Sequence, residues 1–201
     1  EKDRSLSRLK NTMKHPELTM QSGKPYPMGA TVCDNGVNFA VYSANANAIE
    51  LCLFDEQHHE TRFRLPEKDG FIWYGFVANI GVGQRYGYRV YGEYAPEKGY
   101  FFNPNKLLID PYSKQLDGKP ILRNADELAW YRPEDARDNA HIAPKSVVVG
   151  AIQFDWQNDK HPNTPIGQTI IYEAHVKGFT QQFLDLAHAG TYLALADKRV
   201  I

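Results

Sequence analysis

The sequence predicts a mainly β protein: an antiparallel immunoglobulin-like β-sandwich, then a long linker and the first strand of an incomplete (β/α)8 barrel. Three observations lead to this prediction. Short segments of alternating polarity follow one another between residues 37 and 90. A proline-rich stretch without such alternation comes next, and a nearly continuous apolar segment begins at Thr169.

Five segments in the first half of the chain alternate apolar and polar side chains with a period of two: 37–42, 49–54, 61–65, 71–77 and 85–90. This alternation is typical of a strand with one buried and one solvated face. Turn-forming clusters separate the segments, which favours an antiparallel sandwich. The side chains that we expect in its core are Phe39, Val41, Leu51, Leu53, Trp73 and Tyr88.

Changes in composition divide the chain into four parts. Residues 1–22 are polar and mixed in charge, and we interpret them as an arm; residues 23–112 form the predicted sandwich. Residues 113–168 are predicted to be a linker that packs on the barrel, with a strand-like segment only at 146–149. Residues 169–201 are predicted to be the truncated start of the barrel, since a complete one needs about 250 residues.

The segment 169–176 is apolar in its first half and ends in polar groups. A strand of a parallel barrel, buried on both faces, has this composition. Glu173 and His175 lie near its end, where barrel enzymes build their sites. This lone carboxylate has no second carboxyl partner in the segment, so we interpret both residues as structural.

The composition excludes several classes of partner. Lys and Arg number 23 against 24 Asp and Glu, a net charge of −1, which argues against nucleic acid and anionic membranes. No apolar stretch is long enough to span a membrane and the first ten residues lack a secretory signal, so we expect a cytoplasmic protein. Cys33 and Cys52 are too few for a disulfide framework; free thiols are expected, with a single bridge as the alternative.

A series of sequence blocks resembles the isoamylase-type glycogen debranching enzymes of glycoside hydrolase family 13. The blocks are GVNFAVYS at 36–43, ELCLFD at 50–55, GQRYGYRV at 83–90, FNPNKLLIDPY at 102–112, APKSVV at 143–148 and IYEAHVKGFT at 171–180. The resemblance implies a family 48 carbohydrate-binding module over roughly residues 24–112, followed by a family 13 barrel. The chain departs from the family at Tyr100-Phe101, where a His-Arg pair is usual, and at 181–190.

The resemblance implies a hydrolase that acts on α-1,6-glucosidic branch linkages of glycogen or limit dextrin. The family's catalytic carboxylates lie on later barrel strands, so we expect no catalytic residue in this chain and no activity from it alone. A stand-alone, non-catalytic glycogen-binding or regulatory module is the alternative, and a sandwich that only mediates protein contacts is a third. The blocks between 143 and 180 favour the first, because a free module needs no doubly buried strand.

The candidate binding residues are those suited to a sugar polymer. Pyranose rings stack on aromatic side chains, and their hydroxyls bind flanking polar groups. The carbohydrate-binding candidates are Tyr91, Tyr94, Arg89 and Tyr100. A Lys and a Trp flank this region in stand-alone glycogen-binding relatives, with Arg89 and Tyr94 as the nearest counterparts. We therefore expect α-glucan (glycogen, limit dextrin or maltooligosaccharides) and the barrel of the same protein as partners, with no cofactor and no metal.

Overall fold

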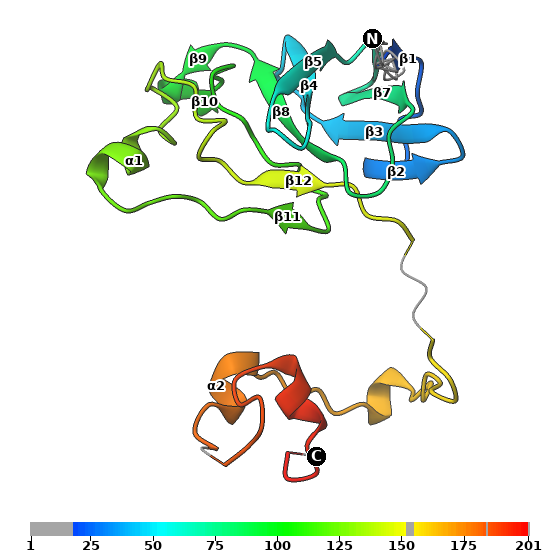
Figure 1. Cartoon of the computed structure of the whole chain (residues 1–201). Coiled ribbons are helices and arrows are strands. Elements are labelled where there is room, and N and C mark those ends of the chain that lie inside the picture. The colour runs from blue at the N-terminus through cyan, green and yellow to red at the C-terminus, as the bar shows by residue number, and fades with distance from the viewer. Residues whose placement is uncertain (1–17, 152–154, 184, 201) are drawn as a thin grey trace, which may run out of the picture. The chain divides into compact units, whose positions relative to one another are not determined.

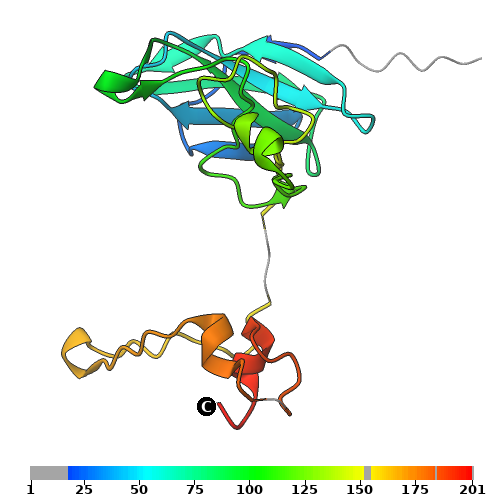
Figure 2. The same ribbon diagram turned by 90° about the vertical axis from the view of Figure 1, so that its left-hand side faces the viewer.

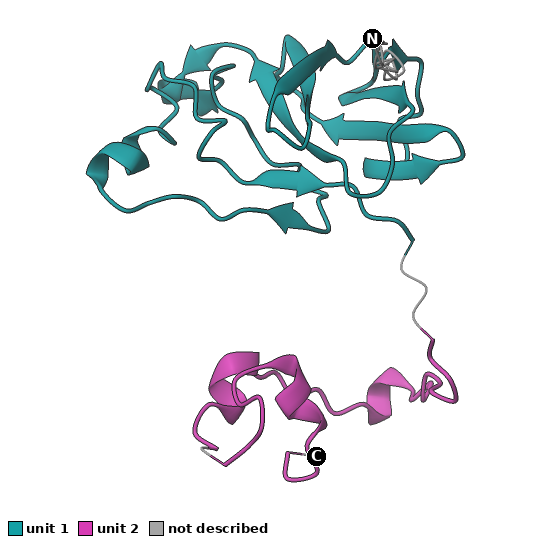
Figure 3. Cartoon of the chain, viewed as in Figure 1, with its two compact units in different colours: residues 1–153 teal, residues 154–201 magenta. Residues whose placement is uncertain are grey.

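The computed structural model describes residues 18–151, 155–183 and 185–200. The chain divides into two compact units, residues 1–153 and residues 154–201 (Figure 3). Most of the predicted arm, residues 1–17, lies outside the described residues. Each unit is described by itself below.

Unit 1 consists mainly of two antiparallel sheets (Figures 1 and 2). The first has the order β1-β7-β3-β2, with β6 also paired to β7: β1 Met20–Gln21, β2 Gly29–Cys33, β3 Gly36–Tyr42, β6 Glu67–Asp69 and β7 Ile72–Ala78. The second has the order β11-β12-β8-β4-β5: β4 Ala48–Phe54, β5 Glu60–Arg64, β8 Arg85–Tyr91, β11 Leu116–Asp117 and β12 Lys145–Val147.

The predicted sandwich is confirmed, and its core lies between the two sheets. Strand β3 contributes Val37, Phe39 and Val41 from one sheet, and β4 contributes Ile49, Leu51 and Leu53 from the other. All six side chains predicted to be buried are buried. Full burial of such a side chain contributes about 1.5–3 kcal/mol, so this apolar layer is the main source of stability.

A hairpin and a short helix complete unit 1. Strands β9 (Tyr94–Ala95) and β10 (Tyr100–Phe101) flank the 3-10 turn η1 (Pro96–Lys98), and helix α1 (Ala125–Ala129) follows later. Gly99 ends the turn with φ near +80°, a conformation that glycine adopts at no steric cost. The turn between β9 and β10 therefore ends at a residue that adopts the required conformation without strain.

The structure differs from the expected connector over 113–168. Strand β12 pairs with β8, with Ser146 opposite Tyr86, and β11 pairs with β12, so these residues extend the second sheet. The outer face of that sheet is covered as well. There Leu107 and Ala143 form a second small core with Cys52 and Phe54. The strand-like segment predicted at 146–149 overlaps β12, whereas no periodicity in the polar, proline-rich residues before it indicates β11 or the pairing with β8. Packing of 113–168 on a barrel stays a prediction.

Residues 107–108 can approach strand β8 closely because residue 87 is a glycine. A Cβ at Gly87 would lie 2.8 Å from Cδ1 of Leu107 and 2.9 Å from the carbonyl oxygen of Leu108. The absent side chain lets Leu108 pair with Tyr88, each backbone N–H donating to the other's carbonyl at 2.8 Å. Strand β8 is consequently buried on both faces, although its alternation predicts one solvated face.

Unit 2 contains short elements only: η2 (Ile166–Gln168), α2 (Val176–Thr180) and η3 (Tyr192–Ala196). The strand expected over 169–176 is not formed in the structure. A strand of this composition needs neighbours at both edges and cover on both faces, and the described residues of unit 2 provide neither. Ile170 and Ile171 are accordingly 95% and 80% exposed. No helix of the described part of the chain is long and apolar enough to cross a membrane.

The fold predicts a sharp contrast in amide hydrogen exchange. Amides of β3, β4 and β8 should exchange slowly, because they are paired on both sides within the sheets. Amides of 169–175 should exchange fast at low protein concentration, since these residues form no regular hydrogen bonding. Mass spectrometry at two concentrations is the measurement. Slow amide exchange across 170–176 that does not depend on protein concentration would contradict the structure.

Candidate functional site

An aromatic groove of about 500 Å³ lies beside the hairpin β9–β10 of unit 1. Its aromatic lining comes from Tyr42, Tyr100, Phe101, Phe102 and Tyr131, and Tyr88 forms part of it from strand β8. The volume lies within the range of small-molecule sites in proteins, about 300–1,000 Å³. The groove is thus large enough for a ligand and is contributed by segments far apart in the sequence.

The hairpin presents two aromatic pairs. Tyr94 lies opposite Phe101 across the two strands, with ring centroids 6.5 Å apart and planes at 79°. Tyr100 packs against Phe102 with centroids 6.4 Å apart. The first pair is edge-to-face and the second is tilted, and aromatic contacts of this kind stabilise by about 0.5–1.5 kcal/mol each, so the rings are held in fixed orientations.

The opposite wall is anchored to the first sheet. Tyr42, at the end of β3, contacts Phe71 with ring centroids 6.0 Å apart. The indole N–H of Trp73 donates to the carbonyl of Ser43 at 3.1 Å, which fixes the loop that follows β3. The ammonium of Lys68 lies 4.6 Å from the centroid of the Trp73 ring. Both walls are therefore supported by contacts outside the groove.

The groove is suited to an uncharged ligand. Of the described residues that line it, none is an Asp or Glu, and its small polar groups are Ser43, Asn45 and Asn103. Its single cation, Lys106, is buried and donates to the carbonyls of Trp130 and Arg137 at 2.8 Å each. Without a pair of carboxyl groups the groove cannot carry out glycoside hydrolysis, but it can bind. Among the described residues no cluster of His, Cys, Asp and Glu could hold a metal ion.

The structure places the predicted tyrosines in three different surroundings. Tyr100 lines the groove, and Tyr94 is 46% exposed on the adjoining hairpin. Tyr91, at the end of β8, is half-buried and donates its hydroxyl hydrogen bond to a carboxylate oxygen of Glu50 at 2.9 Å. Burial and this carboxylate raise the pKa of Tyr91. Tyr94 and Tyr100 thus belong to one region through the hairpin, while Tyr91 is engaged separately.

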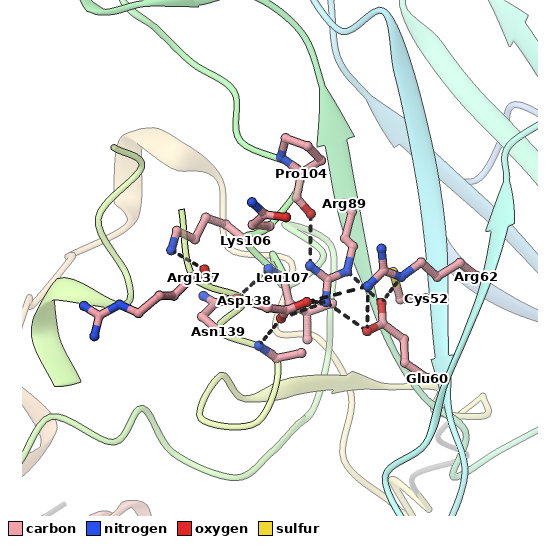
Figure 4. A network of polar contacts seen from close by, with 12 residues as sticks. Cys52, Glu60, Arg62, Arg89, Pro104, Lys106, Leu107, Arg137, Asp138 and Asn139 are labelled. Atoms are coloured by element: carbon pink, nitrogen blue, oxygen red, sulfur yellow. Dashed lines mark hydrogen bonds and ion pairs between the residues drawn. The ribbon is translucent and has the colours of Figure 1, made fainter. Parts of the chain in front are cut away.

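Arg89 requires a correction, because its side chain is 0% exposed. Its guanidinium donates to Glu60 Oε1 at 2.7 Å, to Asp138 Oδ2 at 2.8 Å and to the carbonyl of Pro104 at 2.9 Å (Figure 4). The alternation of β8 predicts that Arg89 faces solvent, but residues 103–107 and 135–139 cover that face. A sugar cannot contact a side chain without exposed surface, so the role of Arg89 is structural.

The Arg89 network links three distant segments. Glu60 belongs to β5, Arg89 to β8 and Asp138 to the loop after α1, and Arg62 adds a further bond to Glu60 at 2.8 Å (Figure 4). Burial by itself raises the pKa of Glu60, but hydrogen bonds from Arg89 and Arg62 outweigh it and lower the pKa to about 2. Burial and Glu60 raise the pKa of the neighbouring Cys52 thiol.

Two further expectations about single residues are resolved. Cys33 and Cys52 are both free, so the alternative of a bridge between them is excluded. His175 caps helix α2, its ring Nδ1 accepting from the N–H of Gly178 at 3.0 Å, which agrees with a structural interpretation.

The sequence prediction missed Tyr42, Phe101 and Tyr131 as lining residues. A usable signal existed for Tyr42, which falls on the polar side of an alternating segment and is followed by a turn. Phe101 stands where the resembled family has Arg, so an aromatic side chain replaces a charged one at this position. Tyr131 carries no local signal, because only the tertiary path of the chain after α1 brings it to the groove.

Comparison with known proteins agrees with this architecture. Residues 27–113 match the carbohydrate-binding module 48 family (isoamylase N-terminal domain). The glycogen debranching enzyme of Klebsiella pneumoniae subsp. pneumoniae is 49% identical over 187 residues, which is 91% of this chain and 28% of that enzyme. That of Pectobacterium atrosepticum is 47% identical, over 90% of this chain and 28% of the enzyme. The resemblance to debranching enzymes is confirmed, and the chain spans about 28% of the length of these relatives.

Two solved structures share the fold. The pullulanase of Anoxybacillus sp. LM18-11, crystallised with maltotetraose, superposes with a TM-score of 0.52 at 20% identity, over 86% of this chain and 21% of that protein. A mutant pullulanase of Paenibacillus barengoltzii, crystallised with maltotriose, gives a TM-score of 0.57 at 18% identity, over 86% and 23%.

The Glu60 ion pairs predict a stability that depends on pH. Because the folded-state pKa of Glu60, about 2, lies below its usual 4.5, the pairs stabilise the fold above pH 4.5 and are lost as pH falls through 2. Glu60→Gln should lower the free energy of unfolding at pH 7 by up to about 3 kcal/mol. Urea denaturation from pH 7 to 2 measures this, and the difference from the unaltered chain should shrink towards pH 2.

Glu97→Gln is the matched control, since Glu97 is an exposed glutamate of η1. It should leave the free energy of unfolding unchanged within about 0.5 kcal/mol. A Glu60→Gln chain as stable as the control at pH 7 would show that the network does not stabilise the fold.

Proposed function

We propose that this chain is the amino-terminal, α-glucan-associated part of a hydrolase that cleaves α-1,6-glucosidic branch linkages of glycogen or limit dextrin. The observation that carries the proposal is an aromatic groove without Asp or Glu in its lining, on a sandwich that matches carbohydrate-binding module 48. The relatives are named glycogen debranching enzymes, and the structural neighbours are pullulanases crystallised with maltooligosaccharides. All of these point to an α-glucan.

The proposed contacts are aromatic. The C–H faces of a glucose ring stack on aromatic side chains, which lose little entropy on binding because they are already fixed by their neighbours. Tyr100 and Phe101 line the groove and Tyr94 extends the surface along the hairpin, with Tyr91 as a further contact at the end of β8. Ser43 and Asn45 supply neutral polar groups for the sugar hydroxyls.

Catalysis is assigned to the rest of the protein. The groove offers no carboxylate pair, and Glu173 lies in unit 2 without a second carboxyl group assigned to it. We propose the barrel of the same protein as the partner of this chain. A cytoplasmic location is part of the proposal, and the free thiols of Cys33 and Cys52 support it.

A stand-alone glycogen-binding or regulatory module is the alternative. The extent of the alignment favours the debranching hydrolase, because similarity to the debranching enzymes covers 91% of the chain while the module match ends at residue 113. A free module would need only the residues that form the two sheets, the last of which is Val147.

Maltooligosaccharide binding is the direct test of the groove. Titration of the chain with maltoheptaose, followed by calorimetry or by NMR, should give weak binding. Tyr100→Ala and Tyr94→Ala should each weaken it by about tenfold, since each removes a stacking surface of about 1 kcal/mol or more. Tyr192→Ala, which removes an exposed tyrosine of unit 2, is the control and should bind as the unaltered chain does. Binding that survives both groove substitutions would place the sugar elsewhere.

The assignment of catalysis predicts an inactive chain. Incubation of the purified 201 residues with glycogen or limit dextrin should release no reducing ends above background. Release of reducing ends would mean that a pair of catalytic carboxyl groups is present, contrary to the proposal. Glu173→Gln would then identify whether Glu173 is one of them.

A further inference from the structure

The exposed aromatic surface continues beyond the groove itself. Tyr42, at the end of β3, lines the groove and is 54% exposed. Its ring contacts the ring of Phe71, with centroids 6.0 Å apart. Phe71 is 52% exposed and lies outside the lining of the groove. The groove and these two rings thus form one contiguous exposed apolar surface, the kind of surface that marks an interaction site.

Backbone pairing holds Phe71 against the wall of the groove. The N–H of Ser43, which lines the groove, donates to the carbonyl of Phe71 at 2.8 Å. Tyr42 itself pairs with Ile72 of β7. The ammonium of Lys68, an exposed residue of β6, lies 6.0 Å from the centroid of the Phe71 ring. Phe71 therefore has a fixed place next to Tyr42, with a hydrogen-bond donor beside it.

The rings of Tyr42 and Phe71 are turned relative to each other, with their planes at 75°. A straight, flat chain of sugars can stack on two aromatic rings only when the two rings are nearly parallel. A chain that curves from one sugar to the next turns its faces and can contact two rings set at a large angle. α-1,4-linked glucose chains curve in this way, whereas β-1,4-linked chains are extended and flat. The angle between the two rings favours an α-linked chain.

We infer that a neutral α-1,4-glucan chain runs out of the groove, over Tyr42 and onto Phe71, and this inference rests on the proposed function. The first sugars stack in the groove, the next one contacts Tyr42, and a further one contacts Phe71. The ammonium of Lys68 donates to sugar hydroxyls at this end of the surface. An uncharged polymer fits because no Asp or Glu is among the described residues that line the groove.

This arrangement makes the affinity depend on the length of the glucan chain. A short oligosaccharide occupies the groove and does not reach Phe71, so it gains nothing from that ring. A longer chain contacts both, and each added aromatic contact contributes to binding. The surface is thereby assigned to the outer chains of a branched or linear α-glucan rather than to small sugars.

The test titrates the whole chain with maltotriose and with maltoheptaose. Phe71→Ala should weaken the dissociation constant for maltoheptaose by about three- to tenfold, the effect of one stacking surface, and leave that for maltotriose unchanged. Phe71→Leu, which keeps the apolar bulk, should lose the same affinity, and Phe71→Trp should keep it. Tyr192→Ala is the control and should bind both sugars as the unaltered chain does. All thermal midpoints should stay the same, since Phe71 is half exposed.

Cellohexaose tests the preference for a curved chain. This β-1,4-linked oligosaccharide should bind more weakly than maltoheptaose, and Phe71→Ala should not change its affinity, because a flat chain that stacks on Tyr42 does not reach the face of Phe71.

Each other result overturns a distinct claim. If Phe71→Ala weakens maltotriose as much as maltoheptaose, Phe71 only positions Tyr42 and the inference is wrong. If Phe71→Leu binds maltoheptaose as the unaltered chain does, the ring of Phe71 does not stack on a sugar and the inference is wrong. Cellohexaose binding that depends on Phe71 as strongly would refute the selection for a curved chain. In these three cases the proposed function stands, because maltoheptaose is still bound. If the unaltered chain binds neither maltooligosaccharide, the proposed function and the inference both fail.

Discussion

The burial of Arg89 between Glu60 and Asp138 is the constraint on which the rest of unit 1 depends. A guanidinium without exposed surface is tolerated only when carboxylates and a carbonyl satisfy its donors, and here they come from β5, from the loop after α1 and from Pro104. These bonds hold a polar segment over the outer face of the second sheet. That cover makes β8 a strand buried on both faces and leaves room for β12 to join the same sheet.

This cover also determines where a ligand can bind. The resembled stand-alone glycogen-binding modules have a Lys near the position of Arg89, and in this chain that part of the surface is occupied by protein. The exposed aromatic side chains that line the groove are Tyr42, at the end of β3, and Phe101, on strand β10. The groove therefore lies away from the face that the Arg89 ion pairs cover.

Local signals predicted the strands and their core well, because the alternation of residues such as Phe39 and Leu51 reflects burial directly. They failed where tertiary cover overrides alternation: Arg89 falls on the polar side of β8 yet is fully buried. Of the four predicted binding residues, Tyr100 lines the groove and Tyr94 is exposed on the adjoining hairpin. Tyr131 reaches the groove only through the path of the chain after α1, which no period or motif encodes.

The pairing of β12 with β8 affects how the domain folds while it is being synthesised. Ser146 pairs with Tyr86, so the second sheet is completed only by closing a loop of about 60 residues, an entropically costly and slow step. The recognised module ends at residue 113, but the cooperative folding unit extends to residue 147 or beyond. A ribosome-bound chain that has exposed only the module would carry Arg89 without Asp138 and Cys52 without Ala143. The homology boundary of this domain therefore lies inside its folding boundary.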